Sequence, residues 1–135
     1  MTTTLARLYT WVASLGLLAQ GGSTLGALLV PAVDHAMPAL LQQTQMVVSH
    51  SLLHVITGLL GLSTLVFGAA WPWRFAIGFG LFYVALGLTG EHSGHALGLG
   101  LKAFDHPFHT VLGSFGLLAA GIDSIRAYWA ERKQA

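Results

Sequence analysis

Long apolar runs separated by short polar segments dominate the chain, and they determine the secondary structure that we expect. Apolar stretches cover about 8–30, 47–70, 73–90 and 107–128. Between Ala36 and Trp73 there is no Asp, Glu, Lys or Arg, and this gap exceeds the roughly 20 apolar residues that a membrane helix needs. Backbone in contact with lipid must satisfy its own hydrogen bonds, so each stretch is predicted to be a transmembrane helix.

The pattern therefore predicts an all-α protein, a four-transmembrane-helix bundle that forms a single domain over residues 1–135. Composition agrees, because 54% of the 135 residues are hydrophobic and 8% are charged, whereas soluble domains carry about 25% charged residues. The mean hydropathy is +0.68. With a net charge of +1 and no basic stripe, nucleic acid is not an expected partner, and the lipid bilayer is.

Basic residues are distributed unequally between the two ends of this predicted bundle. With four spans, one side holds only Lys102. The other side holds Arg7, Arg74, Arg126, Arg132 and Lys133. The excess of positive charge predicts that the N-terminus and the C-terminus both lie in the cytoplasm.

Histidine shows the opposite distribution. With this topology all seven histidines fall in the extracytoplasmic loops or in the outer turns of spans two and four. They are His35, His50, His54, His92, His95, His106 and His109. The sequence leaves open whether the loop histidines His35, His92 and His95 take part in a site.

Two histidine pairs have helical spacing and are the candidate ligands. His50 and His54 are spaced i, i+4, and His106 and His109 are spaced i, i+3, so each pair shares a helix face. Imidazole binds zinc, copper, iron and nickel, and these four histidines are the predicted metal ligands together with Asp105. We expect Asp105 to cap the start of span four and to hold the second nitrogen of a histidine.

A short motif recurs around the two deeper histidines. The pattern H-x-x-x-G-x-x-G-L occurs at His54, Gly58 and Gly61 and again at His109, Gly113 and Gly116. It predicts a 2+2 internal repeat in which two-helix units lie parallel, with an axis along the membrane normal. The two histidines would then lie at equal depth. The glycines are expected to let neighbouring helix backbones approach closely.

The segments "SHSLLHVITGLLGL", "RFAIGFGLFYVALGLTG" and "DHPFHTVLGSFGLLAAG" resemble a family of small bacterial four-helix membrane proteins that is catalogued as a domain of unknown function. In that family, H-x-x-x-G-x-x-G marks span two and D-x-x-x-H marks the start of span four. The resemblance covers about residues 46–122. It implies the architecture and a bacterial inner membrane, but no activity. The additional histidines lie outside its pattern: His50, His92, His95 and His106.

Three functions remain open from the sequence. The first is binding of a metal or a tetrapyrrole: His54 and His109 would ligate heme axially, whereas copper or zinc would use the wider set. The second is a non-catalytic accessory or structural subunit that contacts other membrane subunits or itself. The third is a pH-responsive element based on histidine. An enzyme is least supported, because the chain has no cysteine, no G-x-S-x-G and no H-E-x-x-H.

Overall fold

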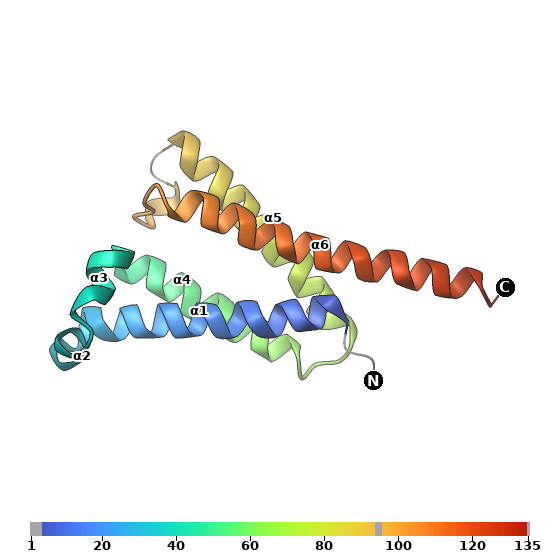
Figure 1. The fold of residues 1–135 in the computed structure, drawn as a ribbon, viewed down its shortest axis with the longest axis horizontal. Coiled ribbons are helices and arrows are strands. Elements are labelled where there is room, and N and C mark those ends of the chain that lie inside the picture. Colours follow the sequence, from blue (N-terminus) through green and yellow to red (C-terminus); the bar gives the residue numbers. More distant parts are fainter. Residues whose placement is uncertain (1–3, 94–95, 135) are drawn as a thin grey trace.

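A computed structural model of the chain describes residues 4–93 and 96–134, without the side chains of residues 91–93 and 96. Over those residues the protein is all-α, which confirms the predicted class (Figure 1). The long helices are α1 (Leu5–Leu29), α4 (Val48–Thr64), α5 (Ala70–Ser93) and α6 (Asp105–Arg132). The short elements are α2 (Pro31–Ala36), α3 (Pro38–Thr44) and the 3-10 turn η1 (Ala96–Gly98).

Within the described residues, three helices are long and apolar enough to cross a membrane: α1, α5 as far as Gly90, and α6. Helix α4 has 17 residues, which corresponds to about 25 Å and is less than the roughly 30 Å of a hydrocarbon core. It becomes a fourth candidate only together with α3, from which it is bent by 93°. The predicted count of four spans therefore stays a prediction.

Helix α4 ends at Thr64, earlier than the predicted boundary near residue 70. At this end the backbone N–H groups of Leu65 and Val66 donate to the carbonyls three residues back, of Leu62 and Ser63, so the last turn tightens as helix ends commonly do. Gly68 follows with a φ of 121°, a left-handed conformation that glycine adopts without steric cost. The apolar residues after Thr64 consequently form a turn, although their composition resembles that of a span.

The other predicted boundaries also shift. Helices α2 and α3 each begin at a proline, Pro31 and Pro38. Proline suits this position because the first N–H group of a helix makes no hydrogen bond within the helix. His35 therefore lies in a short helix and not in the loop that we expected. Helix α6 continues to Arg132, so its polar tail remains helical.

The long helices expose apolar side chains and bury part of their polar ones, which suits a lipid environment. Val12 is 65% exposed, Leu60 56% and Phe115 59%. Contiguous apolar surface of this kind marks a membrane or protein contact. The buried polar residues are Thr10, Ser14, Thr24, His50, Ser51, His54, Asp105 and His109.

The long helices form two hairpins, in which α1 packs mainly on α4 and α5 mainly on α6 (Figure 1). Glycine makes both contacts close. A Cβ atom at Gly58 would lie 2.9 Å from the carbonyl oxygen of Ser14, and one at Gly113 would lie 2.6 Å from the carbonyl oxygen of Gly80. Each hairpin is thus closed by backbone-to-backbone contact, as small residues allow between membrane helices.

The second glycine of each helix contacts both hairpins. A Cβ at Gly61 would overlap the Ser14 hydroxyl of its own hairpin and lie 2.8 Å from the ring of Phe75 in the other. A Cβ at Gly116 would lie 2.8 Å from the carbonyl oxygen of Ala76 in its own hairpin and 2.9 Å from the ring of Tyr9 in the other. The register that pairs His54 with His109 also pairs the two glycines. The hairpins therefore make equivalent contacts at these two positions, as two units related by an approximate two-fold axis would, and the 2+2 repeat itself stays a prediction.

The start of α1 is joined to α6 by Asp123. Its two carboxylate oxygens accept hydrogen bonds from the backbone N–H groups of Leu5 at 3.1 Å and Ala6 at 2.8 Å. The first N–H groups of a helix have no partner within the helix. A side chain distant in sequence thus caps α1, in addition to Thr4, which accepts from the backbone N–H of Arg7 at 3.2 Å.

We expect Gly113→Ala to destabilise the protein, because the new methyl group would overlap the backbone of α5. The expected cost is about 1–3 kcal/mol, as for overpacked cores, and it appears as a lower thermal midpoint in detergent. Gly121→Ala on the same helix is the matched control, since nothing lies within 4 Å of a Cβ there. Equal midpoints for the two variants would contradict the close contact at Gly113.

Candidate metal site

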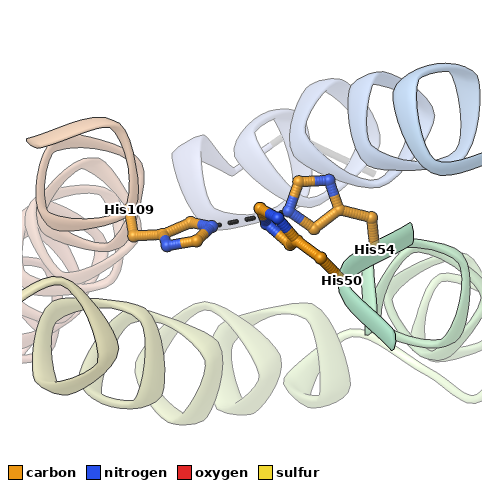
Figure 2. A group of neighbouring side chains, drawn as sticks. All are labelled: His50, His54 and His109. Carbon is orange, nitrogen blue, oxygen red and sulfur yellow. Dashed lines mark hydrogen bonds between the residues drawn. The ribbon is translucent and has the colours of Figure 1, made fainter. Parts of the chain in front are cut away.

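Three histidines from two helices converge in the interior, at the end of the bundle where α4 and α6 begin; we call this the histidine end. Figure 2 shows His50 and His54 extending from α4 toward His109 on α6. Their side chains are 1%, 1% and 0% exposed. Each offers one ligand nitrogen, and the three nitrogens lie within 4.8 Å of one another.

The shortest contact joins the two histidines of the repeated motif. The Nε2 atoms of His54 and His109 are 3.5 Å apart (Figure 2). Two nitrogens bound to one tetrahedral zinc ion lie about 3.3 Å from each other, given Zn–N distances of about 2.05 Å. The ring of His50 completes the group, with its centroid 4.6 Å from that of His54 and 5.4 Å from that of His109.

Glycines on the neighbouring helices hold the histidine-bearing backbone in place. A Cβ at Gly21 on α1 would lie 2.7 Å from both the carbonyl oxygen of Ser51 and the Cβ of His54. A Cβ at Gly87 on α5 would lie 2.6 Å from the carbonyl oxygen of His106. The same contact thus recurs in both hairpins. In each hairpin, the contact lies about one helical turn before the deeper histidine, His54 on α4 and His109 on α6.

The buried imidazoles have few hydrogen-bond partners. Neither ring nitrogen of His50 is hydrogen-bonded, and the Nδ1 atoms of His54 and His109 also lack a partner. A buried polar group without a partner costs about 1–3 kcal/mol, and such a group in a native protein points to an ion, a water or a functional role. The donor set is therefore one that a cation would satisfy.

Asp105 lies beside this group but does not cap α6 as predicted. The cap position is Phe104, and Asp105 is the first helical residue. The Asp105 carboxylate accepts a hydrogen bond from the backbone N–H of Lys102 at 2.7 Å and lies 3.9 Å from Nδ1 of His50. This distance is too long for a hydrogen bond, so the prediction that Asp105 holds the second nitrogen of a histidine stays a prediction.

The other predicted residues lie apart from the group of three. His106 is half-buried, its Nδ1 has no hydrogen-bond partner, and it is not a member of the group. His35 is exposed on α2. The side chains of His92 and His95 lie outside the described residues. The predicted ligand set is thus brought together in part, through His50, His54 and His109.

Tyr83 on α5 is a neighbour of the site that the sequence did not reveal. Its side chain is fully buried, and its ring lies 5.0 Å from that of His109 at 90°. Because the Thr57 hydroxyl donates to the carbonyl of Leu53 at 2.7 Å, the Tyr83 hydroxyl donates to Thr57 at 3.1 Å. A tyrosine within an apolar run signals such a need for a partner.

No family model, no curated protein and no solved structure matches this chain. The resemblance of its histidine motifs to a family of small membrane proteins therefore stays a prediction. Fold and site together define a small all-helical protein with membrane-like helices and a buried three-histidine cluster that could hold a metal.

We expect Tyr83→Phe to lower the stability by about 1 kcal/mol, because one buried hydrogen bond is lost and Thr57 keeps its bond to the backbone. Thermal unfolding in detergent measures the change. Tyr128→Phe is the control, since Tyr128 is 50% exposed. A Tyr83→Phe variant as stable as the Tyr128→Phe variant would show that the Tyr83–Thr57 bond contributes nothing.

Proposed function

We propose that this protein is a small integral membrane protein that binds a first-row transition-metal ion through His50, His54 and His109. One observation carries the proposal: three buried imidazoles have their ligand atoms within 4.8 Å of one another, and His50 has no hydrogen-bond partner at either ring nitrogen. Neutral imidazole is the commonest protein ligand for such ions. One ion would accept a lone pair from each ring and so compensate their burial.

A single ion suits this geometry better than heme. Axial ligation would place a wide, flat macrocycle between His54 and His109, whose Nε2 atoms are 3.5 Å apart. The ring of His50, with its centroid 4.6 Å from that of His54, occupies part of the space that the macrocycle would need. A third imidazole in contact with both others is what a three-nitrogen ion site requires.

The site is proposed to lie on the extracytoplasmic side of a bacterial inner membrane, with α3 and α4 together completing a fourth span. Arg7, Arg74 and Arg126 belong to the turns of α1, α5 and α6 that are far from the histidine end. Positive charge favours the cytoplasmic face. The roles as an accessory subunit or as a pH-responsive element stay predictions.

We expect the protein, purified in detergent without a histidine tag, to bind about one equivalent of Zn²⁺ or Cu²⁺ by calorimetry. His54→Ala and His109→Ala should each weaken binding more than about 100-fold, because loss of a ligand exceeds the 10–100-fold effect of losing an outer-shell partner. His35→Ala is the control, since this histidine is exposed. Equal affinity in all three variants would contradict the site.

Removal of the metal should lower stability. A ligand present at about 1,000 times its dissociation constant stabilises the folded state by about 4 kcal/mol, so EDTA should lower the thermal midpoint of the wild-type protein. The His109→Ala variant should show no such change. A Soret absorption band in the protein as purified would contradict the single-ion proposal and favour heme.

A further inference from the structure

The approximate two-fold relation between the hairpins pairs the site residues in an informative way. The register that matches His54 with His109 also matches His50 with Asp105. Both pairs meet across the boundary between the hairpins. The inner pair has its Nε2 atoms 3.5 Å apart, and the outer pair has Nδ1 and Oδ2 3.9 Å apart.

The two pairs lie one helical turn apart in depth. His50 precedes His54 by four residues, and Asp105 precedes His109 by four, so each outer residue shares a helix face with its inner neighbour. The four side chains thus contribute two donors from each hairpin at two depths. Asp105 lies outside the group whose ligand atoms are within 4.8 Å of one another, so its carboxylate must move toward the imidazoles to bind the same ion. Four donors at two depths can then form the corners of a tetrahedron, the geometry that zinc prefers.

Asp105 has the properties of a ligand and not of a solvated surface acid. Its exposed fraction is 8%, and it is the one acidic residue that is buried among the side chains that the structure describes. The hydrogen bond from the backbone N–H of Lys102 fixes its carboxylate. It also lines a cavity of about 460 Å³ at the histidine end, together with Gln20, Gln43, Gln45 and Lys102. Of the four proposed donors, Asp105 is the one that lines this cavity.

The charge of Asp105 bears on which ion the site selects. Three neutral imidazoles would leave both charges of a divalent ion uncompensated in apolar surroundings, which is costly. One carboxylate halves that net charge. Carboxylate oxygen is a hard ligand that zinc accepts, whereas Cu⁺ prefers soft sulfur ligands. Asp105 consequently favours a divalent ion over Cu⁺.

We propose that Asp105 is the fourth donor of the site, so that three imidazole nitrogens and one carboxylate oxygen select Zn²⁺ over Cu⁺. This inference rests on the proposed metal-binding function. It assigns Asp105 a direct bond to the ion and gives the two-fold repeat a role in the chemistry, since each hairpin supplies two donors.

The test is Asp105→Asn, which keeps an oxygen to accept the hydrogen bond from Lys102 and removes the charge. We expect its Zn²⁺ affinity to fall by more than about 100-fold, which exceeds the 10–100-fold effect of losing an outer-shell partner, while Cu⁺ affinity, measured under reducing conditions by competition with a chromogenic chelator, changes little. Asp34→Asn is the matched control, because Asp34 is an exposed carboxylate on α2. Thermal midpoints in EDTA verify that the variants are folded.

Asp105→His provides a second, independent measurement. By the two-fold relation it would complete a set of four imidazoles, and we expect it to retain more Zn²⁺ affinity than Asp105→Asn and to lose selectivity against Cu⁺. Wild-type protein that binds neither ion would overturn the proposed function itself. Wild-type protein that binds Zn²⁺ as tightly as Asp105→Asn does would overturn the role of Asp105 alone and leave the three-histidine site intact.

Discussion

Close contact between helix backbones at glycine is the constraint on which the rest of the structure depends. Lipid removes most of the hydrophobic drive for helices to associate, so packing must supply the contact energy. Gly58 and Gly113 bring the backbones of each hairpin together, and Gly21 and Gly87 repeat this one to two turns nearer the histidine end. Larger residues at these positions would separate the two helices of each hairpin and displace the backbone that carries His54 and His109.

Much of the fold follows from the distribution of apolar residues. Long uncharged runs predicted the helical class and the approximate positions of α1, α4, α5 and α6. The pattern did not predict where some helices end or begin, nor the contacts between residues that are distant in the sequence. Hydrophobicity does not show that α4 would end at Thr64, before the turn at Gly68, or that Pro31 would begin a short helix. The cap that Asp123 provides for α1 joins residues from opposite ends of the chain, which no local pattern reveals.

The candidate site could be predicted in part, and helix geometry explains the remainder. At 3.6 residues per turn, side chains four positions apart differ in direction by about 40°, and those three apart by about 60° in the opposite sense. His50 therefore accompanies His54 on α4. On α6 the residue equivalent to His50 is Asp105, so His106 has the less favourable spacing for the same cluster. Tyr83 was missed because its proximity to His109 depends on the packing of α5.

The Asp123 cap has a consequence for how the chain is assembled. Helix α1 is synthesised before α6, yet the backbone N–H groups of Leu5 and Ala6 bond to a carboxylate on α6. Until α6 is in place, these donors must find other partners, such as water. Completion of the start of α1 thus waits for the synthesis and packing of α6, and a chain interrupted before Asp123 keeps an unfinished helix start.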